Sequence, residues 1–165
     1  MPIELSLPEQ LSKRDFAQQQ IAIVVSTYNE HITSKLLEGA VRTLKTAGIE
    51  DEQILIVRVP GAWELPFGTQ CAICERRCRG VITLGAVIKG ETTHDQHINR
   101  AVSMSLMQLS LDHNKPVALG LLTVNTLEQA IQRSGGNYGN KGEEAALALI
   151  ACLKITAALD ERQSA

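Results

Sequence analysis

Residues 89–97 bring together side chains well suited to proton transfer. The segment reads Lys-Gly-Glu-Thr-Thr-His-Asp-Gln-His and follows an apolar, β-branched run. Thr93, with Gln96 three residues later, has the form of a capping box, so a helix is predicted to begin with Thr93 as its cap. His94 would then lie in the first helical turn, beside backbone N–H groups that attract an anion. An imidazole in that position can donate and accept protons near neutral pH.

A metal centre is a weaker interpretation of the same segment. His94 and His97 lie three residues apart and could share a metal ion with Asp95. However, Asp95 is expected to project to a different side of the helix, and two histidines with one carboxylate fall short of a full ligand set. We therefore predict no metal site in this segment.

Three of the four cysteines are spaced as if they shared one face of a helix. Cys71, Cys74 and Cys78 stand at positions i, i+3 and i+7 of a predicted helix. A structural zinc site requires four ligands, and no fourth ligand lies nearby in the sequence. Free cysteine packs like a small apolar side chain, and this is the interpretation that we favour.

A cationic, glycine-rich segment follows near the C-terminal end. A P-loop requires an adjacent Gly-Lys pair followed by Ser or Thr, whereas Asn140 and Gly142 stand in those places beside Lys141. A tight turn between two helices is predicted instead, with Lys141 as an exposed charge. Arg133, in the last turn of a short predicted helix, either complements the helix dipole or offers a guanidinium fork to a phosphate or carboxylate. Spacing alone leaves both interpretations open.

Alternating strands and helices must position these side chains. Apolar runs predict strands, and apolar residues at helical spacing predict helices, in the order strands 21–25, 54–59, 81–88 and 116–123 and helices 32–44, from 66, 93–109, 126–133 and 140–157. This order predicts a three-layer α/β/α sandwich, with a four-stranded parallel sheet between helices on both faces. Ligands of such sheets bind beyond the carboxyl ends of the strands. Tyr28 and the segments 62–64, 86–93 and 119–125 should converge at that edge.

Composition narrows the functional class. The chain has 165 residues, enough for one domain, which we place at 21–160 behind an N-terminal arm at 1–20. Sixteen basic against 18 acidic residues give a net charge of −2, and aromatic residues make up only 3%, so binding to nucleic acid or to a membrane surface is not expected. The first twenty residues lack the apolar core of a signal peptide, and no run is long enough to span a bilayer. A cytoplasmic protein is expected.

Several motifs together resemble one family, lumazine synthase, an enzyme of riboflavin biosynthesis with a flavodoxin-like fold. The matching stretches occur in one order with compatible spacing at 59–66, 84–94, 116–123, 127–133 and 139–146. The resemblance implies condensation of 5-amino-6-(D-ribitylamino)uracil with 3,4-dihydroxy-2-butanone 4-phosphate, which yields 6,7-dimethyl-8-ribityllumazine, phosphate and water. It calls for no metal and no organic cofactor.

The resemblance also implies roles for individual residues. His94 matches the proton-transfer position of the family. The residues that would bind the pyrimidine and its ribityl chain are Tyr28, Ala62, Trp63, Glu64, Ala86, Val87, Ile88 and Leu119. The residues that would bind the phosphate are Glu91, Thr92 and Arg133, with Lys141 as a further candidate. Leu119 and Arg133 would reach the site from a neighbouring subunit.

The family implies an assembly as well as a reaction. Its members form pentameric rings, and twelve rings can close into a 60-subunit icosahedral shell, with riboflavin synthase as an expected partner. Two departures from the family pattern stand out: Tyr28 and Leu119 replace phenylalanine, and the residues after His94 lack the usual aromatic side chains. The alternative is therefore a relative that binds a lumazine or flavin, or forms a shell, without turnover.

Overall fold

A central parallel sheet lies between two layers of helices in the computed structural model, which describes residues 2, 4–11 and 19–164. Its four strands are β1 (Gln20–Ser26), β2 (Ile54–Val59), β3 (Cys78–Ile88) and β4 (Val117–Val124), in the order β2-β1-β3-β4. The helices are α1 (Glu30–Thr46), α2 (Leu65–Ile73), α3 (His94–His113), α4 (Leu127–Gln132) and α5 (Lys141–Ser164), with short 3-10 turns η1 (Asp51–Gln53) and η2 (Ala62–Glu64). The predicted arm at 1–20 falls partly outside the described residues.

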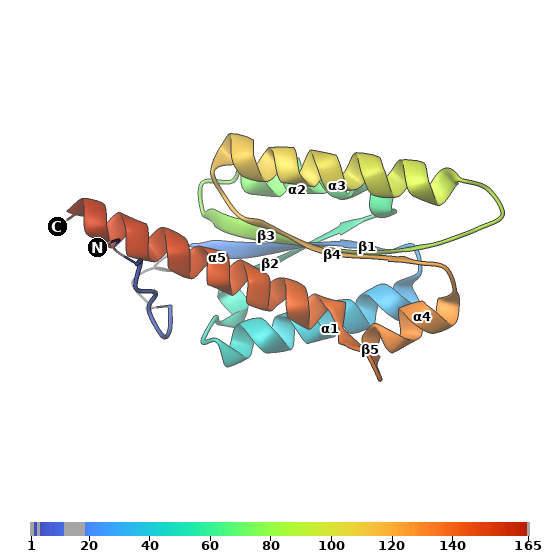
Figure 1. Ribbon diagram of the computed structural model, residues 1–165, viewed down its shortest axis with the longest axis horizontal. Coiled ribbons are helices and arrows are strands. Elements are labelled where there is room, and N and C mark those ends of the chain that lie inside the picture. The colour runs from blue at the N-terminus through green and yellow to red at the C-terminus, as the bar shows by residue number, and fades with distance from the viewer. Residues whose placement is uncertain (1, 3, 12–18, 165) are drawn as a thin grey trace.

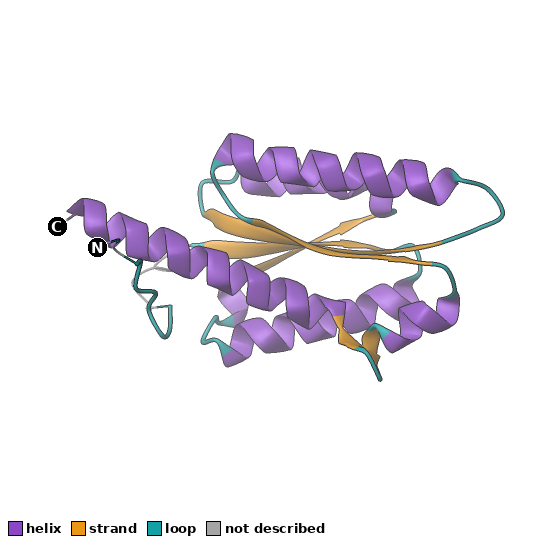
Figure 2. Ribbon diagram, in the orientation of Figure 1, coloured by secondary structure: helices purple, strands orange, loops and turns teal. Residues whose placement is uncertain are grey.

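Helices α2 and α3 cover one face of the sheet, and α1, α4 and α5 cover the other (Figure 1). Figure 2 shows the strands as a thin layer between the two helical layers. The predicted three-layer sandwich with four parallel strands is thereby confirmed. Among the described helices, none combines the length and hydropathy needed to cross a membrane.

Alternate residues of each central strand feed two separate hydrophobic cores. Ile21 and Ile23 of β1 pack toward α1 and α5 in one core, whereas Ala22 and Val24 pack toward α2 and α3 in the other. Both faces of β1 and β3 are covered, which explains why these strands read as continuous apolar runs. The parallel pairing brings the carboxyl ends of β1, β2 and β3 to one edge of the sheet.

Asn140 fastens the start of α5 to the middle of α1. Its side chain is 7% exposed, and its Oδ1 accepts hydrogen bonds from the backbone N–H groups of Gly142 at 2.8 Å and Glu143 at 3.3 Å. Its Nδ2 donates to the carbonyl oxygen of Lys35 on α1 at 2.9 Å. The close approach requires small neighbours, since a Cβ added at Gly39 would lie 2.6 Å from the Asn140 amide. The predicted helix start near residue 140 is confirmed, with Asn140 as the cap.

Replacing Asn140 by alanine is therefore expected to lower the free energy of unfolding by about 1–3 kcal/mol, because a helix cap is lost together with the hydrogen bond that ties it to the Lys35 carbonyl. Chemical denaturation of the variant measures this loss. Asn137→Ala, which alters an exposed asparagine in the neighbouring turn, is the matched control and should change stability by less than about 0.5 kcal/mol. Equal small effects of the two substitutions would contradict the role given to Asn140.

The cysteine prediction is wrong about the shared helical face and, for the exposed Cys71 and Cys74, about packing as apolar side chains. Helix α2 ends at Ile73, Cys74 follows it as the C-cap, and Cys78 begins strand β3. Two backbone hydrogen bonds, from Cys74 N to Gln70 O and from Cys78 N to Glu75 O, close the turn between helix and strand. The charged residues 75–77 favour such an exposed turn, so the three thiols do not share a helical face.

Cys78 is buried, whereas Cys71 and Cys74 are exposed. Burial raises the pKa of the Cys78 thiol, which lowers the fraction of reactive thiolate at neutral pH. We expect Cys78 to react with a thiol reagent at least ~10-fold more slowly than Cys71 and Cys74 in the folded protein. Mass spectrometry of the alkylated protein over time, with a denatured sample as the control, tests this order. Labelling of Cys78 as fast as the other two in the folded state would contradict it.

Candidate active site

The turn after β1 is held between the ends of the two neighbouring strands. The backbone N–H of Thr27 donates to Val59 O at 2.8 Å, and that of Tyr28 donates to Pro60 O at 2.9 Å. Asn29 adopts a left-handed conformation with φ 59°, and its Nδ2 donates to Ala86 O on β3 at 3.0 Å. Asparagine tolerates this backbone region better than most residues. Tyr28 is thereby fixed above the carboxyl edge of the sheet.

His94 begins α3 directly after the loop that leaves β3. A hydrogen bond from Lys89 N to Val124 O at 2.9 Å extends the pairing of β3 with β4 beyond the last strand residue. The expected helix start is confirmed, but the capping box at Thr93 is wrong. The Thr93 side chain makes no capping hydrogen bond, because its φ of −87° and ψ of 15° are close to helical rather than extended. Instead, Thr92 Oγ1 accepts from His94 N at 3.3 Å.

These segments enclose a cavity of about 370 Å³, which we call the His94 cavity. Its lining consists of Tyr28, Asn29, Gly61, Ala62, Trp63, Ala86, Val87, Ile88, Gly90, Thr92, His94, Asp95 and Ile98. Tyr28 and Trp63 are 72% and 60% exposed, so much of both aromatic side chains faces solvent. The arrangement suits a planar, polar ligand that stacks on an aromatic ring.

Eight of the predicted site residues meet in this cavity: Tyr28, Ala62, Trp63, Ala86, Val87, Ile88, Thr92 and His94. Glu64 and Glu91 do not belong to the lining. Glu64 closes η2, and its backbone N–H donates to the carbonyl oxygen of the lining residue Gly61 at 3.2 Å. Glu91 lies exposed in the loop between β3 and α3.

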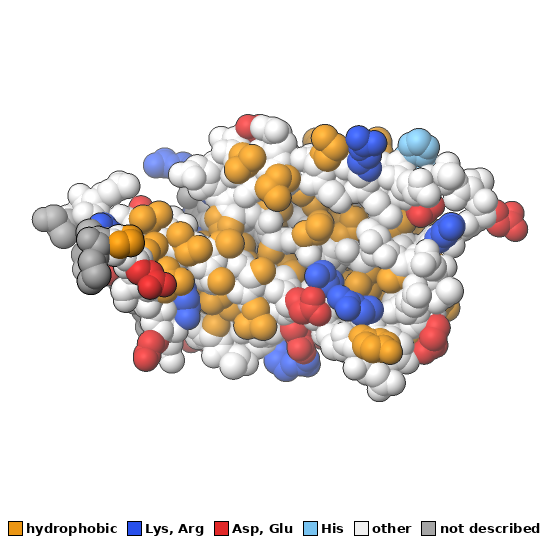
Figure 3. Space-filling model, viewed as in Figure 1, with side chains coloured by type: hydrophobic (Ala, Val, Ile, Leu, Met, Phe, Trp, Pro, Cys, Tyr) orange, Lys and Arg blue, Asp and Glu red, His pale blue; other side chains and the backbone are white. Residues whose placement is uncertain are grey.

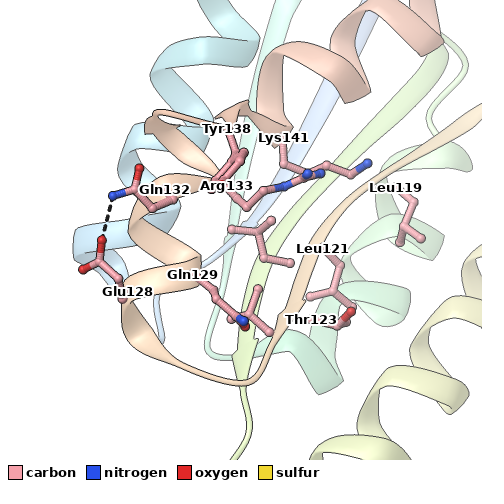
Figure 4. A pocket seen from close by; sticks show the side chains of 11 residues that line it. Leu119, Leu121, Thr123, Glu128, Gln129, Gln132, Arg133, Tyr138 and Lys141 are labelled. Atoms are coloured by element: carbon pink, nitrogen blue, oxygen red, sulfur yellow. Dashed lines mark hydrogen bonds between the residues drawn. The ribbon is translucent and has the colours of Figure 1, made fainter.

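The remaining predicted residues line a second cavity, of about 780 Å³, on the other helical layer. We call it the Arg133 cavity; it is lined by Leu119, Leu121, Leu122, Thr123, Val124, Glu128, Gln129, Gln132, Arg133, Tyr138 and Lys141. Figure 4 shows the Arg133 and Lys141 side chains extending in the same direction from the α4 and α5 ends. In a single chain, therefore, His94 and Arg133 line different cavities.

A short hairpin brings the two cations together although they stand eight positions apart. Strands β5 (Ser134–Gly136) and β6 (Gly139–Asn140) pair antiparallel, and Lys141 N donates to Arg133 O at 2.9 Å. The predicted turn between helices is thus a hairpin. The helix predicted at 126–133 is confirmed as α4, and Thr126 caps it, since the Thr126 side chain accepts from Gln129 N at 3.2 Å.

Glu144 contacts both cations of the Arg133 cavity. Its Oε1 lies 3.7 Å from Arg133 Nη2, and its Oε2 lies 3.1 Å from Lys141 Nζ. All three side chains remain partly exposed, so each ion pair contributes only about 0–1 kcal/mol. A dianionic phosphate could compete for these cations at little cost, which suits anion binding.

Sequence reasoning missed several lining residues. In the His94 cavity these are Asn29, Gly61, Gly90, Asp95 and Ile98, and in the Arg133 cavity they include Gln129, Gln132 and Tyr138. The position of Asn29 directly after a predicted strand was an available signal, since asparagine is favoured in left-handed turns. Asp95 was expected to project away from His94, yet both residues line the same cavity.

Comparison with known proteins agrees with this geometry. The family model described as 6,7-dimethyl-8-ribityllumazine synthase matches residues 18–157. A protein of that name from Rhodopirellula baltica is 51% identical over 136 residues, which cover 82% of this chain and 88% of the relative. Another from Parabacteroides distasonis is 41% identical over 143 residues, covering 87% of this chain and 89% of the relative. The chain therefore belongs to the 6,7-dimethyl-8-ribityllumazine synthase family.

Proposed function

We propose that this chain is the transferase that condenses 5-amino-6-(D-ribitylamino)uracil with 3,4-dihydroxy-2-butanone 4-phosphate. The observation that carries the proposal is the His94 cavity, where an imidazole at the start of a helix lies among aromatic and apolar groups. The products are 6,7-dimethyl-8-ribityllumazine, phosphate and water, and the step belongs to riboflavin biosynthesis.

The pyrimidine binds in the His94 cavity. Tyr28 and Trp63 offer ring surfaces, and Ala62, Ala86, Val87 and Ile88 form the apolar wall. Glu64 follows Trp63 in the chain, and its backbone N–H donates to the lining residue Gly61. Holding the amine and the ketone together in one orientation supplies much of the rate enhancement in such a condensation.

His94 moves protons in each step of the reaction. The 5-amino group attacks the ketone carbon, and protonation of the carbonyl oxygen allows water to leave as the imine forms. Loss of a proton from carbon then expels phosphate, and attack by the ribityl-bearing nitrogen closes the ring with loss of a second water. One imidazole near neutral pH can donate and accept these protons in turn.

The phosphate binds Arg133 and Lys141, supported by Thr92 and Glu91 of the loop before α3. Since Arg133 and Leu119 line a different cavity from His94 within one chain, we place them in the site of an adjoining subunit. Each complete site is then built from two copies of the chain.

This sharing requires a homo-oligomer, which we propose to be a cytoplasmic pentamer that can assemble further into a 60-subunit shell. Support comes from the exposed apolar residues of β4 and α5: Leu119, Leu147, Ile155 and Leu159 are between 42% and 60% exposed. Figure 3 shows apolar side chains gathered over this face. A patch of this kind is typical of a protein interface. Riboflavin synthase, which would consume the product, is the proposed partner.

Mixing the purified chain with both substrates tests the function directly. Formation of the lumazine, followed by its absorbance, is the expected result. Binding of a lumazine or flavin without turnover would instead identify the non-catalytic relative. Light scattering of the same sample distinguishes a pentamer from a shell.

A further inference from the structure

Asp95 carries an acceptor that nothing in the described part of the chain uses. It lines the His94 cavity together with His94 and Trp63. Its Oδ1 is shielded from solvent and has no hydrogen-bond partner among the described residues. A buried carboxylate oxygen without a donor is costly, so such a group in a binding cavity calls for a donor from outside the chain.

Stabilisation of the helix alone does not account for this oxygen. An acidic side chain in the first turn of α3 interacts favourably with the helix dipole. However, a capping carboxylate would accept backbone N–H groups, whereas here His94 N donates to Thr92 Oγ1 and Gln96 N donates to Thr93 O. Asp95 Oδ1 accepts neither.

The position of Asp95 on the helix makes the carboxylate more unusual. Ile98, Val102 and Leu106 follow it at helical spacing and pack into the core between α3 and the sheet. Asp95 is therefore a polar residue at the start of an otherwise apolar face of α3, where this face borders the His94 cavity. An apolar residue at this position would avoid the cost of the unpaired oxygen.

We propose that Asp95 binds the pyrimidine substrate by accepting a hydrogen bond from one of its N–H or O–H groups, which deepens the function proposed above and rests on it. An ionised carboxylate has only acceptor sites, and the ribitylaminopyrimidine carries several donors on its amino groups and ribityl chain. The phosphorylated ketone is an anion that the Asp95 charge would repel. Asp95 thus favours the uncharged substrate as its own ligand, while the phosphate binds Arg133 and Lys141 with support from Thr92 and Glu91, as proposed above.

The test uses the full chain and an unreactive probe, the pyrimidine substrate with a nitro group in place of its 5-amino group. In calorimetric titrations, Asp95→Ala is expected to weaken binding of this probe at least ~10-fold, and Asp95→Asn, which keeps one acceptor oxygen, should weaken it less. In steady-state assays the KM for the pyrimidine should rise, while the KM for the phosphorylated ketone stays unchanged or falls.

Asn99→Ala is the matched control. Asn99 stands one turn further along α3, and its Oδ1 is also buried without a partner, but it does not line the cavity. This variant should bind the probe like the wild type. A second probe, with a methyl group in place of the ribityl chain, shows whether the donor to Asp95 is a ribityl hydroxyl or an N–H group of the pyrimidine. If Asp95→Ala leaves its affinity unchanged, the donor is a ribityl hydroxyl, and if affinity falls, the donor is an N–H group of the pyrimidine moiety.

Thermal unfolding distinguishes binding from a structural role. Removing an unpaired buried oxygen should not lower the melting temperature, so a marked fall together with equal rises in both KM values would overturn the proposal. Unchanged affinity of both Asp95 variants for the nitro probe would also overturn it. A wild-type chain that binds the probe without turnover would contradict only the proposed function, whereas one that fails to bind the probe contradicts both.

Discussion

Replacing Arg133 by glutamine is expected to lower kcat/KM for the phosphorylated ketone about 100-fold. Glutamine keeps polarity and much of the length of the side chain but loses the charge and the two parallel N–H donors that match phosphate oxygens. The effect should appear mainly in KM for this substrate, because the contacts proposed for the pyrimidine lie mostly in the His94 cavity. Steady-state kinetics with each substrate varied in turn measure the difference.

Two further variants show which property of Arg133 accounts for the expected fall in kcat/KM. Arg133→Lys keeps the charge but not the fork, so it should recover only part of the activity. Arg76→Gln removes an equally charged, exposed side chain from the turn between α2 and β3 and should leave the kinetics unchanged. If Arg133→Gln binds the phosphorylated substrate as well as the control does, the guanidinium only complements the end of α4.

Removing the imidazole by His94→Ala should lower kcat about 100-fold, because general acid–base catalysis typically contributes at least this much. Both KM values should change little, since the cavity walls remain. A fall in kcat with unchanged KM values therefore separates a role in proton transfer from one in binding.

His97→Ala provides the control for this prediction. His97 stands three residues along the same helix, is exposed and does not line the cavity. Its loss should not affect kcat. Equal rates for His94→Ala and the wild type would remove His94 from the mechanism, whatever the fate of the assembly.

The layers of the fold could be predicted because burial follows the sequence pattern closely. Strands β1 and β3 are covered on both faces, so they appear in the sequence as unbroken apolar runs. The apolar residues predicted to face inward from α5, such as Leu149 and Leu153, are buried in the structure. The helix starts at Thr126 and Asn140 were also predictable, because each has a side-chain acceptor in the right place.

Predictions of local structure failed where the conformation of a few backbone residues decides how a helix begins or ends. The sequence from Thr93 to Gln96 matches the capping-box pattern, but the backbone of Thr93 is nearly helical, and its hydroxyl makes no capping hydrogen bond. Helical spacing grouped Cys78 with Cys71, although a turn at 75–77 ends the helix and begins β3. Neither backbone change leaves a periodic signal, so pattern reasoning had no means to detect it.

The site was predictable in parts but not as a whole. Strand ends indicated where Tyr28, Trp63 and His94 would meet, and they line one cavity. Asp95 was missed because helical spacing assigns a direction to a side chain without showing what surrounds it. The relation between the two cavities lies beyond one chain, since it depends on how copies pack.

The central claim is that His94 of one subunit and Arg133 of the next complete one site. Subunit complementation tests it: His94→Ala and Arg133→Gln are co-expressed with different affinity tags, and oligomers that carry both tags are purified. At equal mixing in a ring, roughly a quarter of the shared sites combine an intact His94 with an intact Arg133, so activity should recover to about a quarter of the wild-type value. If both residues serve the same site from one chain, no site is intact, and the mixed oligomers will show only the residual rates of the two variants.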